Sequence, residues 1–424
     1  MRKPNQRREA DARAGVDSSG SSNTIGSSSA IGSSITIGSS SAIGSSNTRR
    51  KIGVVGPYPP FRGGIAHFTE QFHLNLVRTE SQAELSSAVH VVGISFHRQY
   101  PTWLFPGKSQ FATDSAEHVK ADRLLDSINP LSWDRVATHL IQEGVDEVVF
   151  MYWMPFFAPA YLRIIQLLKR ADIRVTAIVH NASPHEKQPF GLTLSKAFLS
   201  RCDRVIALSS TVKRDIITIG VKGEIQVAAH PVYNQFGNAV DPSAAREKLG
   251  IDPTRPVILF FGLVRKYKGL DILLSALPKV KAPTTLLVAG EWYEGRSELK
   301  KLIQEEGISD RVIIRDEYIP DDEVHLYFSA ADVLIQPYRS ATQSGVVQTA
   351  FHFGLPSIVT GVGGLPEMVE HDVNGWVVAP EDPDALARAI DHFYEPDCKE
   401  RLTKGAQKAQ DGNSWGEFVA KFLS

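Results

Sequence analysis

Short apolar runs alternate with amphipathic segments along the chain from residue 51 onward. In the first half these runs cover residues 52–55, 89–94, 148–151, 175–179 and 205–208. A second series covers residues 257–261, 285–289, 312–314, 333–335, 357–359 and 376–378. Between the runs, apolar residues recur at helical spacing, as at Ile65, Phe68, Phe72 and Leu76. Continuous apolar strands that alternate with helices are typical of parallel sheets covered on both faces.

The two series meet near residues 236–242. A chain of 424 residues is too long for one typical hydrophobic core, so its length agrees with a division at this point. We therefore predict an α/β protein with two doubly wound, Rossmann-like domains and a cleft between them. The first domain is predicted at residues 51–236 and the second at residues 237–400.

Residues 1–50 have a different texture, rich in serine and glycine, with an Ile-Gly pair every six residues from Ile25 to Gly44. An Ile-Gly hexad is also typical of a left-handed parallel β-helix. Four nearly identical, serine-rich units cannot enclose a core, so we predict a disordered tail. Its basic start is followed by no apolar segment, which argues against a secretory signal.

Composition excludes several classes of protein. With 42% hydrophobic residues, 22% charged residues and a net charge of −1, the chain has no bulk attraction to nucleic acid. Its two cysteines, Cys202 and Cys398, provide no disulfide framework and agree with a cytoplasmic location. Residues 148–168 form the most apolar stretch, but Pro155, Pro159 and Arg163 interrupt it. We expect no spanning helix there. Peripheral contact at the inner face of a membrane stays open.

Ligands of open α/β sheets bind at the carboxyl ends of the strands, and several polar loops lie there. Gly63 and Gly64 stand between the first strand and a helix, where free amides suit a phosphate, although a plain turn explains them equally well. The G-x-G-x-x-G dinucleotide fingerprint is absent. Arg265 and Lys268 lie in the loop at residues 262–269, and such cations stabilise a diphosphate leaving group. A solvated basic loop is the alternative.

Two further strand ends carry candidate residues. The polar loop at residues 337–346 enters a helix near Ser344, so the amides of Ser344, Gly345 and Val346 could hold a second phosphate. His180 ends the run at residues 175–179 and could hydrogen-bond a sugar hydroxyl. A lone histidine at a strand end is more often structural.

In this order the motifs resemble family 4 of the retaining glycosyltransferases, which have the GT-B fold. The resemblance covers nearly all of residues 51–424. Its specific pieces are the Gly-Gly-Ile start at residues 63–65, the basic loop at 262–269, Gly363-Gly364-Leu365-Pro366-Glu367, and the segment at 374–380. Residues 95–101, His180-Asn181 with Pro184-His185-Glu186, and residues 341–345 are similar to a bacterial subgroup. Residues 401–424 resemble the family's C-terminal helix, which packs back on the first domain.

The resemblance implies roles for the matching residues. The second domain would bind a nucleotide-diphosphate sugar, with Lys268 on the diphosphate and Ser344, Gly345 and Val346 offering amides to it. His180 would contact the donor sugar. Gly63 and Gly64 would approach the donor phosphates or the acceptor. Family members usually need no metal or other cofactor, and no Asp-x-Asp motif ends a strand here. The acceptor would be a glycan, a lipid-linked molecule or another compound used in polysaccharide or glycoconjugate assembly.

Two departures from the family put parts of this interpretation in doubt. Leu263 stands where an arginine is usual, so Arg265 would take over that role. The usual pair of glutamates, with seven residues between them, is missing, because the two possible alignments place Ala341 and Thr349, or Thr342 and Ala350, at these positions. The candidates to replace the pair are Glu291, Gln343 and Gln348.

Two other functions remain open. A nucleotide-sugar epimerase or hydrolase also has two facing Rossmann-like domains, but it needs acid and base carboxylates that the motif loops hardly supply. A non-catalytic protein that binds a nucleotide sugar would explain the missing glutamates. The acceptor side is expected in the first domain, around residues 98–110 and 153–157, whose aromatic residues could equally belong to the core.

Overall fold

The computed structural model describes residues 50–78, 89–101, 109–112, 118–182, 190–233, 235–412 and 414–424. The predicted tail, apart from its last residue, and the motif at residues 184–186 lie outside these ranges.

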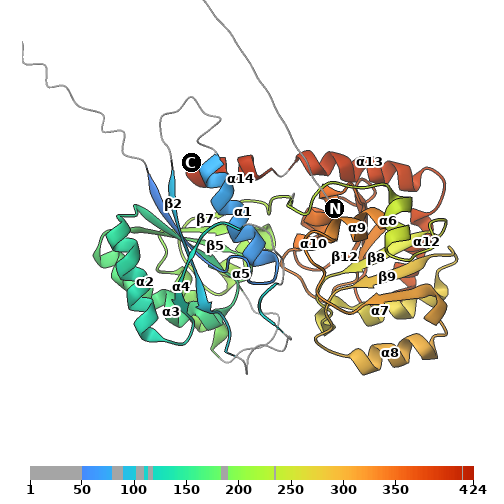
Figure 1. Cartoon of the computed structure of the whole chain (residues 1–424), viewed down its shortest axis with the longest axis horizontal. Helices are drawn as coiled ribbons and strands as arrows, with labels where there is room; N and C mark the ends of the chain where they lie inside the picture. Colours follow the sequence, from blue (N-terminus) through green and yellow to red (C-terminus); the bar gives the residue numbers. More distant parts are fainter. Residues whose placement is uncertain are drawn as a thin grey trace, which may run out of the picture. The chain divides into compact units, whose positions relative to one another are not determined.

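The first domain contains a parallel sheet with the strand order β3-β2-β1-β4-β5-β6-β7 (Figure 1). Its strands are β1 (Lys51–Val55), β2 (His90–Arg98), β3 (Asp122–Asp126), β4 (Glu147–Tyr152), β5 (Arg174–Val179), β6 (Arg204–Ala207) and β7 (Ile225–Val227). Its helices are α1 (Gly64–Arg78), α2 (Pro130–Glu143), α3 (Ala158–Arg170), α4 (Gly191–Leu199) and α5 (Ser210–Thr218). The central strand β4 is buried along its whole length, as its apolar sequence predicts.

The second domain repeats this architecture with the strand order β10-β9-β8-β11-β12-β13. Its strands are β8 (Val257–Phe261), β9 (Thr285–Ala289), β10 (Val312–Arg315), β11 (Val333–Gln336), β12 (Ser357–Thr360) and β13 (Gly375–Val378). Its helices are α6 (Pro242–Lys248), α7 (Leu270–Ala276), α8 (Arg296–Glu305), α9 (Val324–Ala330), α10 (Gly345–His352), α11 (Leu365–Met368) and α12 (Pro383–Phe393). The predicted two-domain α/β architecture with parallel sheets is confirmed.

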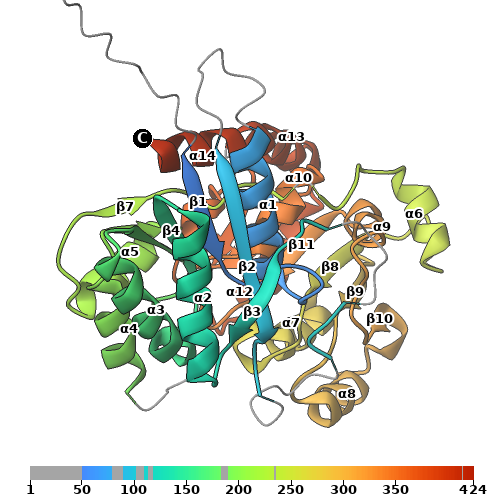
Figure 2. The same cartoon turned by 60° about the vertical axis from the view of Figure 1, so that its left-hand side comes forward.

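The C-terminal segment consists of α13 (Cys398–Asp411) and α14 (Trp415–Leu423). Helix α13 contacts α10 in the second domain, and Gln410 Nε2 donates to the carbonyl of His352 at 3.0 Å. Helix α14 packs against α1, where the rings of Phe68 and Phe418 lie edge to face with centroids 5.6 Å apart. Figures 1 and 2 both show α14 beside α1. The boundary predicted at residue 401 therefore falls inside α13, and within the described residues it is α14 that reaches the first domain.

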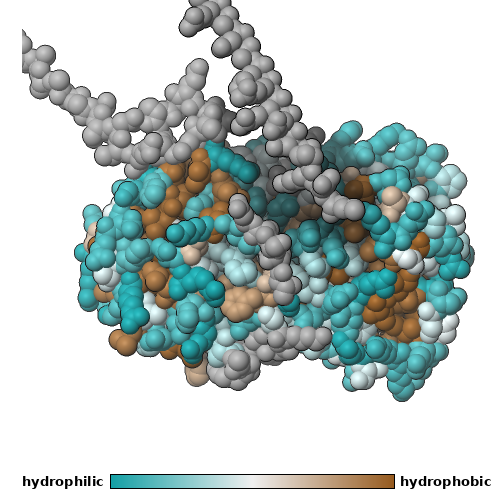
Figure 3. Space-filling view, in the orientation of Figure 1, coloured by the Kyte–Doolittle hydropathy of each residue, from teal (hydrophilic) through white to brown (hydrophobic). Residues whose placement is uncertain are grey.

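Along the described part of the chain, no helix combines the length and the apolar character needed to cross a bilayer. The surface drawn in Figure 3 carries separate hydrophobic areas with hydrophilic residues between them. Large exposed apolar side chains include Phe190, which is 81% exposed, and Leu131, which is 67% exposed.

Candidate active site

The loop after β8 brings a cation and a helix start to one glycine. Gly262 has a φ of 100°, and a Cβ added to it would lie 3.0 Å from Lys268 Nζ and 3.7 Å from Val346 Cγ2. The Lys268 ammonium and the first turn of α10 therefore lie on the same side of this glycine. Gly269, which follows Lys268, has a φ of 69°, and a Cβ there would come within 2.0 Å of the Pro337 carbonyl. The glycine that ends the motif is thus a steric requirement of this loop.

Lys268 is a buried cation, only 9% exposed. Burial lowers the pKa of its ammonium to about 8, and the nearby positive charge of Arg265 adds to this shift. Nζ lies 5.7 Å from the centre of the Tyr338 ring. No carboxylate of the described residues forms an ion pair with it. A buried charge without a partner is unfavourable, so this position suits an anionic ligand.

The start of α10 is held by its own capping residue. Ser344 Oγ accepts from the Val347 amide and donates to Gln336 Oε1 at 2.8 Å. Gly345 and Val346 occupy the first turn, where amides have no partner inside the helix. The Ser344 amide, however, donates to the Met368 sulfur at 3.3 Å, and sulfur is a weak acceptor. A phosphate would have to displace that contact to use the Ser344 amide.

His180 lies in the first domain, directly after β5, and is 1% exposed. Burial, and then the neighbouring His230, hold the pKa of its imidazole well below the ordinary value, so the ring is neutral. Its Nε2 is buried and has no hydrogen-bond partner among the described residues. The His180 carbonyl accepts from Thr342 Oγ1 at 3.3 Å, and Thr342 also hydrogen-bonds Asn181. These contacts join the His180 loop to the segment that leads into α10.

Tyr233 lies between the starts of two helices from different domains. Its hydroxyl donates to the Gly64 carbonyl in α1 at 2.7 Å. A Cβ on Gly345 in α10 would lie only 2.8 Å from the Tyr233 ring. Any side chain at position 345 would therefore displace this ring. Sequence reasoning missed Tyr233, because Gly64 is 169 residues away along the chain.

Gly63 and Glu291 flank a second contact between the domains. Gly63 has a φ of 108°, which favours glycine over any residue with a side chain. The preceding residue, Arg62, places Nη1 3.2 Å from Glu291 Oε2, and its guanidinium lies 4.4 Å from the centre of the Tyr318 ring. Arg265 stacks over Tyr293 with 5.3 Å between its guanidinium carbon and the ring centre. The carboxylate of Glu291 is thus already paired across the domains.

The glycine-rich motif at residues 363–367 forms a third contact between the domains. Gly363 has a φ of 53°, and a Cβ there would lie 1.5 Å from the Ala341 carbonyl. Glycine at this position allows the motif to pack against the Ala341 carbonyl. The Glu367 carboxylate accepts from the Ser210 amide at 2.7 Å and from the Thr211 amide at 2.8 Å, at the start of α5. A carboxylate is favourable at the positive end of a helix.

The positions of the missing glutamates are buried in the structure. Thr342 faces the His180 loop, whereas Thr349 Oγ1 donates to the Gly345 carbonyl within α10 at 3.0 Å. Nearby amide groups are incompletely satisfied, because Gln336 Nε2, Gln343 Oε1 and Gln348 Oε1 are buried without a partner in the described part of the chain. Neutral amides therefore surround the start of α10. Among the same residues, no cluster of three or more histidine, cysteine or acidic side chains could hold a metal ion.

The structure brings most of the predicted site residues to the start of α10. From the first domain, Gly64 is linked to it through the Tyr233 hydroxyl, and His180 is linked to it through Thr342. Lys268 and Val346 meet at Gly262 in the second domain. Glu291 instead pairs with Arg62, and its predicted contact with a ribose or sugar stays a prediction, as do the roles of Gly63, Arg265 and Gln343.

Two family models match separate parts of the chain. The model described as Glycosyltransferase Family 4 matches residues 90–233, and the model described as Glycosyl transferases group 1 matches residues 255–395. The fold is that of solved GT-B glycosyltransferases. Sucrose-phosphate synthase from Thermosynechococcus elongatus superposes with a TM-score of 0.70 and 19% identity over 88% of this chain and 98% of that one. Anabaena HepE in complex with UDP and glucose superposes with a TM-score of 0.64 and 18% identity over 88% and 99% of the two chains.

Curated relatives agree with the family models. A D-inositol 3-phosphate glycosyltransferase of Xylanimonas cellulosilytica is 34% identical over 44% of this chain and 45% of its own length. An uncharacterized glycosyltransferase of Methanocaldococcus jannaschii is 30% identical over 52% of this chain and 59% of its own length. The chain thus spans about half the length of the curated relatives it matches. It belongs to glycosyltransferase family 4.

Proposed function

We propose that this protein is a retaining glycosyltransferase that moves a sugar from a nucleotide-diphosphate sugar to an acceptor. The observation that carries the proposal is Lys268, a buried ammonium beside Gly262 and the first turn of α10 that pairs with no carboxylate in the described residues. A diphosphate at this position would receive a charged hydrogen bond from Lys268 and amide hydrogen bonds from α10. The same groups would stabilise the negative charge that develops when the glycosidic bond breaks.

His180 supports the orientation of the donor sugar in this proposal. Because its imidazole is neutral, one ring nitrogen can donate a hydrogen bond and the other can accept one. Nε2 is the atom left without a partner in the described residues, so it is the candidate to meet a sugar hydroxyl. The leaving phosphate can take the proton of the acceptor, so the proposed chemistry needs neither a protein nucleophile nor a metal ion.

The named ligands of similar proteins guide the choice of donor and acceptor. Similar structures are described with UDP, with UDP-glucose and with ADP. We therefore propose a nucleoside diphosphate sugar as the donor and a glycan or lipid-linked molecule as the acceptor. We also propose that the reaction serves polysaccharide or glycoconjugate assembly at a cytoplasmic site.

Calorimetric titration of the purified protein with UDP, ADP and GDP tests the donor site first. Transfer of labelled sugar from the corresponding donors to a cell-derived acceptor extract then tests catalysis. Tight nucleotide binding without transfer or hydrolysis of any donor would support a non-catalytic binding protein instead. The absence of binding to all three diphosphates would overturn the proposed donor site.

A further inference from the structure

The candidate diphosphate site lies where the strand order of the second sheet reverses. Strand β8 pairs with β9 on one side and with β11 on the other, and β11 is followed by β12 on that other side. Ligands of such sheets bind in the crevice between the two loops that diverge at this point. The loop after β8 carries Lys268, and the loop after β11 leads into α10. A diphosphate held by both loops requires a fixed distance between them.

The backbones of these two loops are joined directly. The Arg339 amide donates to the Tyr267 carbonyl at 2.7 Å. One residue earlier, the centre of the Tyr338 ring lies 5.7 Å from Lys268 Nζ and 6.0 Å from the centre of the Tyr267 ring. The segment at residues 338–339 therefore lies against the short turn that presents Lys268.

The Arg339 side chain strengthens this junction through contacts that we call the Arg339 clamp. Its Nη1 donates to the Lys266 carbonyl and to Asp271 Oδ1, each at 2.8 Å, and its Nη2 donates to Asp271 Oδ2 at 2.7 Å. Its Nε lies 2.6 Å from Oε1 of Glu381, which stands between β13 and α12. Lys266 and Asp271 flank Lys268 along the chain. The guanidinium thus holds both ends of the turn that contains Lys268.

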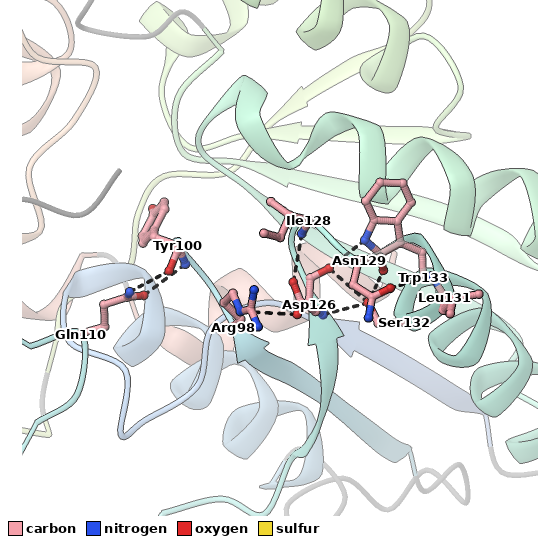
Figure 4. A network of polar contacts seen from close by, with 9 residues as sticks. All are labelled: Arg98, Tyr100, Gln110, Asp126, Ile128, Asn129, Leu131, Ser132 and Trp133. Carbon is pink, nitrogen blue, oxygen red and sulfur yellow. Dashed lines mark hydrogen bonds and ion pairs between the residues drawn. The ribbon is translucent and has the colours of Figure 1, made fainter. Parts of the chain in front are cut away.

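Arg339 has little capacity left to bind a phosphate itself. A guanidinium has five N–H groups, and the clamp occupies four of them. Its charge is offset by two carboxylates, and its side chain is 23% exposed. Arg98 of the first domain contrasts with it, because Arg98 is 49% exposed and its Nε lies 3.5 Å from Asp126 Oδ2 (Figure 4). Any effect of Arg339 on a diphosphate must therefore pass through the residues that it holds.

We propose that Arg339 is a positioning residue for the diphosphate, because its clamp keeps Lys268 and the entry to α10 at the distance at which both reach one ligand. The proposal rests on the proposed transferase function. Without the clamp, Lys268 keeps its charge, but fewer contacts hold the turn that presents it. Affinity for a diphosphate should then fall only while Lys268 is present, since Arg339 itself does not touch the ligand.

A double-mutant cycle, measured by calorimetric titration of the full chain with UDP, tests the proposal. Arg339→Met should weaken UDP binding about fivefold or more, whereas adding it to Lys268→Met should change the affinity by less than about twofold. Arg339→Lys keeps the charge but loses the planar set of donors, so it should weaken binding nearly as much. If the losses of the two single variants multiply in the double variant, Arg339 acts independently of Lys268 and the proposal is overturned. Wild-type affinity in either variant of Arg339 also overturns it.

Arg163→Met is the matched control. Arg163 forms a two-point pair with Asp134 in the first domain, with Nε 2.7 Å from Oδ1 and Nη2 2.9 Å from Oδ2. This variant loses an arginine–aspartate pair of the same kind and should bind UDP as the wild type does. Thermal melting of each variant checks folding. If Arg339→Met does not fold, Asp271→Asn takes its place in the cycle, because it weakens the clamp and keeps the arginine.

Hydrogen exchange without any ligand separates this proposal from the proposed function. The Lys268 amide donates to the Arg265 carbonyl at 2.9 Å within the turn, and this amide should exchange at least about tenfold faster in Arg339→Met but not in Arg163→Met. If the wild type binds UDP and Arg339→Met changes neither exchange nor affinity, the clamp is wrong and the donor site stands. If the wild type binds none of UDP, ADP and GDP, the donor site is wrong, and the positioning role is wrong with it.

Discussion

Replacing Lys268 with methionine should stabilise the unliganded protein and weaken binding of a diphosphate. Methionine keeps most of the length and the apolar stem of the side chain but removes its charge. Because Lys268 is buried without a carboxylate partner in the described residues, its charge is a cost to the folded state. The same charge stabilises the protein only when an anion is bound to it.

The stability effect follows from the pKa of the ammonium. Burial, and then Arg265, lower this pKa from its ordinary value of 10.5 to about 8. Keeping Lys268 charged at pH 7 then costs the folded state roughly 3 kcal/mol, at about 1.4 kcal/mol for each unit. The unfolded chain holds this proton up to a pH near 10.5, whereas the folded chain releases it near pH 8. The penalty is therefore complete below pH 8, shrinks as the pH rises, and is gone above pH 10.5.

The binding effect has the opposite sign. A hydrogen bond between charged partners contributes roughly 1.5–3 kcal/mol, so Lys268→Met should weaken UDP binding by about 10-fold to 150-fold. UDP binding to the wild-type protein should also weaken as the pH rises through 8, since the ammonium then loses its proton.

Urea unfolding and calorimetric titration with UDP measure the two effects. Lys266→Met is the matched control, because Lys266 is an exposed lysine two residues away in the same loop. The control variant should change the free energy of unfolding by less than about 0.5 kcal/mol and should leave the UDP affinity nearly unchanged. If Lys268→Met destabilises the protein at pH 7 while UDP affinity is unchanged, Lys268 is a structural residue and the assigned diphosphate site is wrong.

Three further predictions concern the surroundings of Lys268. Activity should persist in EDTA, because the positive charge at the proposed site comes from side chains and helix ends; complete loss, with recovery on adding magnesium or manganese, would contradict this. Gln343→Ala or Gln348→Ala should raise KM for the donor several-fold, since each has a buried amide oxygen without a partner in the described residues, and unchanged kinetics of both would exclude them as replacements for the glutamates. Tyr233→Phe should cost about 1 kcal/mol of unfolding free energy, as measured in urea, because it removes the hydrogen bond to the Gly64 carbonyl. The same variant should lower UDP affinity only slightly, and an unchanged free energy of unfolding would mean that this contact is not formed in solution.

The sequence predicts the fold well because most strands are buried on both faces. Two edge strands, β3 and β7, were missed. Asp122 and Arg123 at the start of β3 are exposed, so the strand lacks a continuous apolar run. Strand β7 has three residues, including the polar Gln226. A strand at the edge of a sheet needs less apolar surface, and its sequence signal is weaker accordingly.

The candidate site is predictable only in part. Glycines before helices and cations after buried strands carry a local signal, which singled out Gly64, Lys268 and Gly345. Contacts between the domains carry no such signal. Glu367 caps α5 from 157 residues away. Arg62 directly precedes the glycine motif at residues 63–65, yet nothing in the sequence pairs it with Glu291. Such pairs depend on how the two sheets face each other, which a pattern along the chain does not encode.

The missing glutamates and the unpaired lysine have a common physical consequence. Two carboxylates at the domain contacts are already satisfied within the described residues, since Glu291 pairs with Arg62 and Glu367 caps α5. Glutamates at positions 341 and 349, or at 342 and 350, would have added negative charge beside α10. With alanine and threonine there, and with neutral glutamines around the start of that helix, the positive charge of Lys268 is not offset nearby. Attraction for a diphosphate should therefore be retained, whereas sugar and ribose hydroxyls lose a charged acceptor and depend on the weaker amide oxygens.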